Sequence, residues 1–346
     1  MVRMATVQNV FDKMTSVESL FDSWRLFRSG KSGRRDVQEF ERNLEKNIFQ
    51  LHRDLVGKKY KHAAYTSFFI QDPKVRHIRK ACVRDRLVHQ AIYTALVRIF
   101  EPQLIHDLYS SRLGKGTHAG VNAVAHMARK VSKNNTKPCW ALKCDVRKFY
   151  DSVDHESLIN LLGKKVSDDA AMSLIKGVIE SFHCEGTLGL GLPIGNLTSQ
   201  VFTNIYLNEL DQFIKHTLRI KHYARFADDF VLLSNRKRDL EAALPRIQNF
   251  LAEQLKLELH PHKISLRPLA QGIDFLGYVI LPNHRVLRTT TKRRMLRKVS
   301  ERHSGYFKGE VAGDSFNQTM QSYLGMLSHA DTHELTQNLK NQFCWG

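Results

Sequence analysis

Two adjacent carboxylates, Asp228 and Asp229, stand between two runs of aromatic and aliphatic residues, 222–227 and 230–233. Runs of this composition predict the two strands of a hairpin with the acids at or beside its tight turn. Neighbouring carboxylates repel each other unless a positive charge lies close by, so a divalent metal is the first candidate partner. A plain surface turn, for which Asp is a common residue, is the alternative for the pair taken alone.

A third acid, Asp145, lies near the end of another apolar run, residues 140–146. If this run is a strand, its residues 140, 142, 144 and 146 face one way and Asp145 faces the other. Three acids on two separate strands would suit a divalent metal. A salt bridge from Asp145 to Lys143 or Arg147 is the structural alternative, and the residues alone leave both interpretations open.

A second hairpin is predicted over residues 65–79, with its turn at Asp72-Pro73. Its second strand and the segment that follows are rich in cations, and guanidinium groups match phosphate oxygens. The candidate ligands of a triphosphate are Arg76, Arg79, Arg84 and Arg86. A solvated basic face, paired in part by Asp85, is an equally open alternative.

Two glycine-containing loops precede predicted helices. Residues 110–118 read Ser-Ser-Arg-Leu-Gly-Lys-Gly-Thr-His, and residues 186–195 contain four glycines. Glycine lets a backbone approach a ligand closely, and the start of a helix favours anions. The first loop is not a Walker A loop, because its spacing is wrong and no strand precedes it.

The composition indicates a polyanionic partner. The 346 residues contain 53 Lys and Arg against 34 Asp and Glu, a net charge of +19. This excess favours nucleic acid over a membrane, since charge without a hydrophobic anchor binds membranes weakly. Five cysteines without a Cys-x-x-Cys pair argue against a zinc ribbon or a disulfide framework. With no signal peptide and no run near the roughly 20 apolar residues of a membrane span, we expect a soluble, cytoplasmic protein.

In their order along the chain, these motifs resemble those of the reverse transcriptase family. Residues 143–150 are similar to its first palm motif, residues 192–200 to the second, and residues 226–229, Phe-Ala-Asp-Asp, to its Tyr-x-Asp-Asp box with Phe for Tyr. Residues 76–86 resemble its fingers, His262-Lys263 the following palm motif, and residues 274–278 its primer grip. The resemblance covers most of the chain from about residue 60 onward.

The resemblance implies an α+β fold of the right-hand polymerase type, with fingers, a palm sheet and a small helical thumb. The expected division is a helical N-terminal segment at 1–60, fingers and palm at 61–280, and a basic helical thumb at 281–346. The implied activity is RNA-directed DNA synthesis. Asp145, Asp228 and Asp229 would be catalytic and would hold two Mg²⁺ ions, with the Val146 carbonyl as a further ligand. Magnesium suits these hard oxygens better than zinc, because there is no Cys or His cluster.

The resemblance also implies roles for residues around the acids. Those expected to contact the nucleotide are Arg76, Arg84, Arg86, Tyr150, Gln200 and Lys263. Those expected to contact template and primer are Arg112, Lys115, Gly277, Tyr278, Arg293 and Arg297. The Tyr150 ring would lie under the incoming sugar and clash with a 2′-hydroxyl, so deoxynucleotides would be preferred.

One departure points to a subfamily. Most of the family reads Pro-Gln-Gly and ends the second palm motif in Ser-Pro, whereas this chain has Ile194 and Gln200 at those positions. This form resembles the reverse transcriptases of diversity-generating retroelements. Ile194 lacks the polar side chain of the family's Gln, which helps to hold template and nucleotide in register. The resemblance therefore implies an error-prone enzyme, chiefly opposite template adenines.

That subfamily implies several partners: a structured template RNA, the cDNA or primer, deoxynucleotides and a small basic oligomeric accessory protein. The gene would be bacterial, archaeal or phage-encoded. A retron, abortive-infection or group II intron-like reverse transcriptase stays open, because the Ser-Gln form need not be exclusive to one subfamily. So does a non-catalytic RNA-binding or maturase-like scaffold, although all three acids are present.

Overall fold

The chain forms two compact units in the computed structural model, which describes residues 9–71 and 74–343. The first unit comprises the described parts of Met1–His106, Asp145–Arg219 and Pro245–His262, and the second comprises those of Asp107–Cys144, Ile220–Leu244 and Lys263–Gly346. The turn predicted at Asp72-Pro73 lies outside the described residues. The units alternate along the chain, because strands distant in sequence pair into one sheet. The division into an N-terminal segment, fingers and palm, and thumb stays a prediction.

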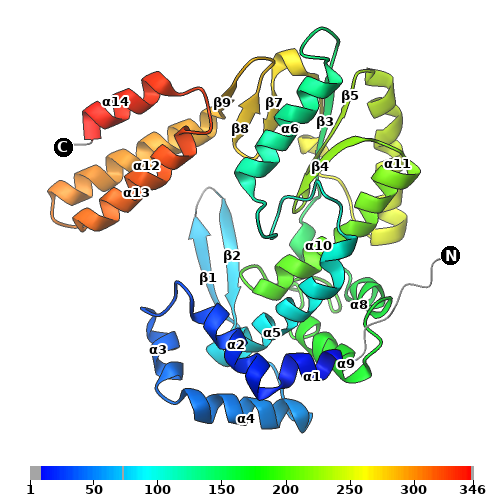
Figure 1. Cartoon of the computed structure of the whole chain (residues 1–346), viewed down its shortest axis with the longest axis vertical. Helices are drawn as coiled ribbons and strands as arrows, with labels where there is room; N and C mark the ends of the chain where they lie inside the picture. The colour runs from blue at the N-terminus through cyan, green and yellow to red at the C-terminus, as the bar shows by residue number, and fades with distance from the viewer. Residues whose placement is uncertain (1–8, 72–73, 344–346) are drawn as a thin grey trace. The chain divides into compact units, whose positions relative to one another are not determined.

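The first unit is mainly helical. Its helices are α1 (Val10–Thr15), α2 (Val17–Arg28), α3 (Arg35–Glu41), α4 (Leu44–Val56), α5 (Val83–Phe100), α7 (Phe149–Ser152), α8 (His155–Gly163), α9 (Asp169–Ile179) and α10 (Leu197–Gln212), with short helical turns at Glu101–Gln103, Phe213–Thr217 and Pro261–Lys263. Strands β1 (Thr66–Gln71) and β2 (Val75–Lys80) form a separate antiparallel hairpin, as predicted (Figure 1).

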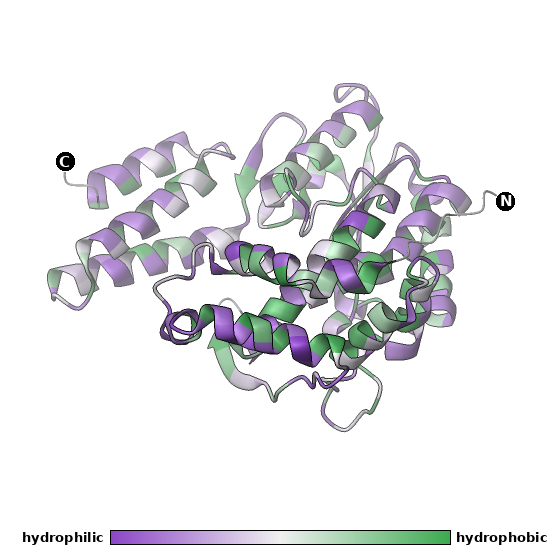
Figure 2. Ribbon diagram, turned by 60° about the horizontal axis from the view of Figure 1, so that its bottom comes forward, coloured by the Kyte–Doolittle hydropathy of each residue, from purple (hydrophilic) through white to green (hydrophobic). Residues whose placement is uncertain are grey.

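The helices of this unit form where apolar residues recur at helical spacing. In α2, Leu20, Trp24 and Phe27 are buried, and the Ser16 hydroxyl accepts the Ser19 N–H at 3.2 Å to cap the first turn. Two helices, α3 and α4, take the place of the single one that the apolar stripe from Val37 to Leu51 predicts, because the chain breaks at residues 42–43. Hydrophilic and hydrophobic residues occupy different faces of the helices in Figure 2.

The second unit is built on a four-stranded sheet of order β4-β5-β3-β6. Its strands are β3 (Trp140–Asp145), whose last residue is the first of its segment in the other unit, β4 (His222–Phe226), β5 (Asp229–Ser234) and β6 (Ser265–Pro268). A second sheet contains β7 (Ile273–Phe275), β8 (Tyr278–Ile280) and β9 (Arg285–Leu287), after a short helical turn at Leu269–Gln271. Antiparallel strands together with helices confirm the predicted α+β class.

The second unit has four helices of its own in the described residues. They are α6 (Thr117–Val131), α12 (Thr289–Phe307), α13 (Gly313–Leu327) and α14 (His333–Phe343), while α11 (Lys237–Leu255) passes into the first unit at Pro245. α6 packs on β4, β5 and β8, and α12 packs on α13. Gly120 allows the close approach of α6, because a Cβ there would lie 3.1 Å from the Leu276 side chain.

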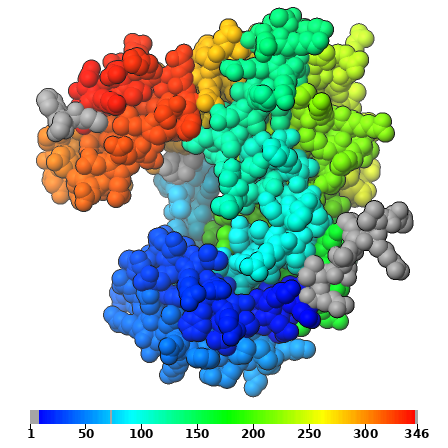
Figure 3. Space-filling view, in the orientation of Figure 1, coloured from blue at the N-terminus to red at the C-terminus, as the bar shows by residue number. Residues whose placement is uncertain are grey.

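The last three helices share one core with the sheets. Met295 and Val299 of α12, Phe316 of α13 and Leu339 of α14 are all buried in it. Figure 3 shows these helices, coloured orange to red, as one continuous body of side chains. In the described parts of the chain, no helix is both long enough and apolar enough to cross a membrane.

Candidate active site

The paired acids lie at a hairpin turn, as the sequence predicts. β4 and β5 pair antiparallel, and their last partners are Phe226 and Asp229. Ala227 and Asp228 therefore form a two-residue loop, and Asp229 is the first residue of β5. Ala227 has a φ of +52°, a left-handed backbone that is uncommon for residues other than glycine. The turn thus holds both carboxylates at the end of two buried strands.

The third acid lies on the neighbouring strand of the same sheet. β3 is adjacent to β5, and Asp145 is its last residue. Lys143, two residues earlier and therefore on the same face of the strand, places its Nζ 3.5 Å from Asp229 Oδ2. A cation is therefore already in contact with one of the three acids.

The backbone around Asp145 is held by the segment before the short helix at Pro261–Lys263. The Asp145 carbonyl accepts the His260 N–H at 2.8 Å, and Val146 forms an isolated antiparallel bridge with Leu259. Arg147, one of the two cations weighed as a salt-bridge partner of Asp145, lies 3.2 Å from the Glu258 carboxylate. Within residues 9–71 and 74–343, no three His, Cys, Asp or Glu side chains converge into a ready-made metal site.

The four arginines proposed to grip a triphosphate differ in how they are held. Arg76 is exposed on β2. Arg79 contacts Glu185 at 2.8 Å, and Arg84 lies over the Tyr60 ring and 3.3 Å from Asp85. The side chain of Arg86 is only 12% exposed, pairs with Asp36 and lies 5.0 Å from the centre of the Phe27 ring. Arg86 is therefore tied into the helical core, whereas Arg76 is open to solvent.

The second palm-like motif is fastened to β2. The Ile194 carbonyl accepts the Arg79 N–H at 2.9 Å, and Asn196 Nδ2 donates to the Arg79 carbonyl at 2.8 Å. Gly195, with a φ of +111°, leaves room for this approach, because a Cβ would lie only 2.8 Å from Ile78 Cγ2. Ile194 itself is partly exposed. Its side chain can therefore be changed without removing the backbone bonds.

Tyr150 and Gln200 belong to the same part of the first unit. The Tyr150 carbonyl accepts the Leu192 N–H at 2.6 Å, which joins α7 to the second palm-like motif. The Tyr150 ring is partly exposed and lies edge-on to Phe149, with their centres 5.6 Å apart. Gln200 is exposed on the first turn of α10. Neither side chain is enclosed in the core.

The residues predicted to contact template and primer all belong to the second unit, and one of them is buried. Tyr278 is 2% exposed, and its hydroxyl donates to the Met326 carbonyl at 2.9 Å. Its ring packs in the hydrophobic core, and its contact with template or primer stays a prediction. Gly277, with a φ of +88°, forms the turn between β7 and β8.

The cationic side chains predicted to contact template and primer are exposed or partly exposed. Arg293 and Arg297 are exposed one turn apart on α12, and Arg297 lies 3.5 Å from Glu301. Arg112 donates to the Leu108 carbonyl at 3.3 Å, and Lys115 lies 5.1 Å from the centre of the Tyr109 ring. Lys263, predicted to contact the nucleotide, is partly exposed at the end of its short helix.

Two buried residues that contact the turn, Ser110 and Arg225, are not among the site residues expected from the sequence. Ser110 is 4% exposed and Arg225 is fully buried. The sequence did contain one indication that Arg225 has a specific role, because a charged residue within an apolar strand needs a specific partner. Ser110 had none, because a serine in a glycine-containing loop is ordinary.

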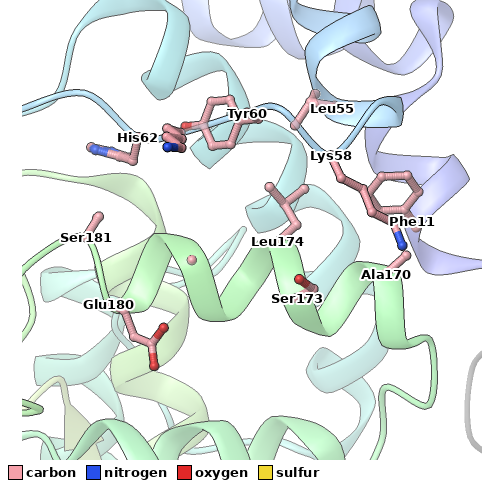
Figure 4. A pocket seen from close by; sticks show the side chains of 12 residues that line it. Phe11, Leu55, Lys58, Tyr60, His62, Ala170, Ser173, Leu174, Glu180 and Ser181 are labelled. Atoms are coloured by element: carbon pink, nitrogen blue, oxygen red, sulfur yellow. The ribbon is translucent and has the colours of Figure 1, made fainter.

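A cavity of about 340 Å³ lies in the first unit, between the segment around Tyr60 and helix α9 (Figure 4). Phe11, Leu55 and Leu174 supply its apolar wall, and His62 and Glu180 are among its polar lining residues. None of the residues predicted from the sequence to act in the site is among those that line it.

Comparison with protein families decides the identity of this arrangement. Residues 70–280, well over half of the chain, match the family described as reverse transcriptase (RNA-dependent DNA polymerase). The chain belongs to the reverse transcriptase family. It therefore carries an RNA-dependent DNA polymerase domain, and the expected fold of that family is confirmed.

The curated relatives of this reverse transcriptase include intron-encoded proteins. Protein YkfC of Escherichia coli (strain K12) is 25% identical over 265 residues, which cover 66% of this chain and 67% of YkfC. Group II intron-encoded protein LtrA of Lactococcus lactis is 22% identical over 288 residues, 64% of this chain and 46% of LtrA. The alignment thus spans about two thirds of YkfC and less than half of LtrA.

Among solved structures, the reverse transcriptase is similar to apo telomerase from Candida tropicalis truncated from its C-terminal domain. The TM-score is 0.49 at 12% identity, covering 70% of this chain and 60% of the telomerase.

Proposed function

We propose that this protein copies RNA into DNA, with Asp145, Asp228 and Asp229 as its catalytic carboxylates. The observation that carries the proposal is the strand order of the four-stranded sheet. β5, which begins at Asp229, lies beside β3, which ends at Asp145. The turn residue Asp228 directly precedes β5, so all three acids belong to one sheet and its hairpin turn.

The donor set fits magnesium, because it consists of hard carboxylate oxygens and the Val146 carbonyl. Two Mg²⁺ ions held by these groups would activate the primer 3′-hydroxyl and neutralise the charge of the triphosphate and its leaving group. Lys143 offsets part of the repulsion among the acids through its contact with Asp229. The ring of Tyr150 restricts the space beside the nucleotide sugar, and the exposed Arg76 offers its guanidinium to phosphate.

Primer extension on an RNA template with Mg²⁺ tests the proposal. Asp228→Asn should lower the rate at least about a hundredfold, because an amide lacks the negative charge with which a carboxylate binds the metal. Asp239→Asn is the matched control, since Asp239 pairs with Arg236 at the start of α11. Extension at the wild-type rate by Asp228→Asn would instead favour the non-catalytic RNA-binding scaffold.

Within this family we place the protein among the error-prone enzymes of diversity-generating retroelements. Ile194 and Gln200 support this assignment through the motif resemblance, and the partial exposure of Ile194 agrees with a contact to substrate rather than to the core. A structured template RNA and a small basic oligomeric accessory protein would be its partners. Error spectra on a defined RNA template, scored at adenines against the other bases, test the assignment.

A group II intron-like reverse transcriptase is the second candidate. The relative LtrA is named as a group II intron-encoded protein, and this observation favours the alternative. The two candidates predict different error spectra, since only the first predicts errors concentrated at template adenines. An even, low error rate at all four template bases would favour the intron-like enzyme.

A further inference from the structure

Ala227 occupies a backbone conformation that the turn alone does not stabilise. It is the first of the two loop residues between Phe226 and Asp229, and its φ is +52°. Asp228, the second loop residue, is not among the described residues with positive φ. A positive φ at the first central residue alone is the φ pattern of a type II′ turn, in which glycine is preferred at that position. A residue with a Cβ is strained there and persists only where its surroundings hold it.

Two buried side chains hold both polar backbone groups of Ala227. Its N–H donates to Ser110 Oγ at 2.9 Å, and its carbonyl accepts from Arg225 Nη1 at 3.1 Å. Ser110 is 4% exposed and Arg225 is fully buried. Ala227 itself is partly exposed, so water can replace a lost partner only in part, and the loss of either hydrogen bond weakens the hold on its backbone.

Ser110 is itself fixed relative to the turn. The Tyr109 N–H donates to the Arg225 carbonyl at 2.9 Å, and the Arg225 N–H donates to the Asp107 carbonyl at 3.0 Å. Leu108 forms a parallel bridge with Arg225. Residues 107–110 therefore run beside β4 in register with it, and this register brings Ser110 alongside Ala227.

The same segment leads into the glycine-containing loop of residues 110–118. The Gly116 N–H donates to the Tyr109 carbonyl at 2.9 Å, which closes this loop onto the residue before Ser110. Arg112 and Lys115 lie within the closed loop. The loop and the acidic turn are consequently connected by hydrogen bonds through Tyr109 and Ser110.

We propose that Ser110 and Arg225 are positioning residues of the active site. They hold Ala227 in its strained conformation and thereby fix where Asp228 and Asp229 lie. Neither residue needs to touch substrate, because each acts through the backbone of Ala227. The inference rests on the proposed role of the two aspartates.

Amide hydrogen exchange tests the hydrogen bond directly. Ser110→Ala should raise the exchange rate of residues 226–229 about tenfold or more, because the Ala227 N–H loses its acceptor. Ser110→Thr retains a hydroxyl and should restore slow exchange. Ser234→Ala is the matched control, since it removes a hydrogen-bonded hydroxyl at the other end of β5. Rapid exchange throughout the chain would mean that Ser110→Ala is unfolded. In that case the same measurement is made on the near-isosteric Ser110→Cys, whose thiol is a weaker acceptor.

Activity provides the second measurement. In primer extension, Ser110→Ala should lower kcat about tenfold and raise the Mg²⁺ concentration for half-maximal rate, with little change in KM for deoxynucleotide. Ser110→Thr should restore most of the wild-type kcat and of the wild-type Mg²⁺ dependence. Unchanged exchange at 226–229, or activity within about twofold of wild type at every Mg²⁺ concentration, would overturn the inference.

Asp228→Asn, measured in parallel, separates the two proposals. If Asp228→Asn is inactive while Ser110→Ala behaves as wild type, the positioning inference alone fails. If Asp228→Asn is active, the proposed role of the aspartates fails, and with it the inference that rests on that role.

Discussion

His89 Nδ1 lies 2.6 Å from the hydroxyl of Thr198, so a buried imidazole of α5 is hydrogen-bonded to the first turn of α10. His89 is 1% exposed and Thr198 is equally enclosed. On its other side, His89 Nε2 is 3.0 Å from His62 Nε2, and His62 lies 3.7 Å from the buried carboxylate of Asp85. This polar network supports the helix that carries Gln200. Burial, followed by the neighbouring His62, lowers the pKa of His89 from 6.5 to about 3.

The pH dependence of stability should report this buried histidine. In the unfolded chain His89 takes up a proton below about pH 6.5, whereas in the folded chain it stays neutral to about pH 3. The contribution of the neutral, buried His89 to the free energy of unfolding is fully present above pH 6.5 and is lost as pH falls toward 3. Urea unfolding across this range should show that the free energy of unfolding falls less steeply with decreasing pH in His89→Gln than in wild type. Parallel plots of this free energy against pH would contradict the lowered pKa of His89.

His89→Ala should be markedly less stable than His89→Gln. Alanine leaves a cavity and a buried Thr198 hydroxyl without its imidazole partner, at a cost of about 2–4 kcal/mol in the free energy of unfolding. Glutamine retains a polar group that can reach that hydroxyl. Urea unfolding at pH 8 separates this packing effect from protonation, and equal stability of the two variants would argue against the hydrogen bond.

Arg86→Ala should affect folding more than nucleotide binding. Arg86 pairs with Asp36 and packs on Phe27, so its removal should lower the free energy of unfolding by about 1–3 kcal/mol. The KM for deoxynucleotide should change less than in Arg76→Ala, whose side chain is exposed. A larger increase in KM for Arg86→Ala than for Arg76→Ala would instead support a role for Arg86 in binding the nucleotide.

Tyr150→Ala should weaken the exclusion of ribonucleotides. Removal of the ring opens space for a 2′-hydroxyl, and the ratio of kcat/KM for deoxynucleotide over ribonucleotide should fall about tenfold or more. Tyr150→Phe keeps the ring and should keep the ratio. An unchanged ratio in Tyr150→Ala would place the discrimination at another residue.

Ile194→Gln should lower misincorporation opposite template adenine. The substitution adds a polar side chain at a partly exposed position and leaves the backbone bond from Ile194 to Arg79 in place. Ile194→Val is the control that keeps an apolar side chain and should keep the error spectrum. Sequencing of cDNA made on one RNA template gives both rates, and equal error rates for Ile194→Gln and wild type would count against the role of this residue.

The local elements and the acidic pair could be predicted from the sequence. The alternation of residues 140–146 and the apolar runs around Asp228 predict β3, β4 and β5, because side-chain periodicity follows directly from strand geometry. Leu20, Trp24 and Phe27 recur at helical spacing with Ser16 before them, which likewise predicts α2 and its cap. Motif order then identified the family, since the spacing of short motifs along a chain is a property of sequence.

Long-range pairing could be decided only by the tertiary structure. Nothing local shows that Lys143 contacts Asp229, that Arg86 is committed to Asp36, or that Tyr278 is buried rather than exposed to template. Each outcome depends on which segments pack together, and a charged side chain or a tyrosine suits either a surface or a partnered interior. The contacts of Ser110 and Arg225 with Ala227 belong to the same class. The sequence by itself determined which residues are able to perform the chemistry, and the packing of distant segments determined which backbone groups hold those residues in place.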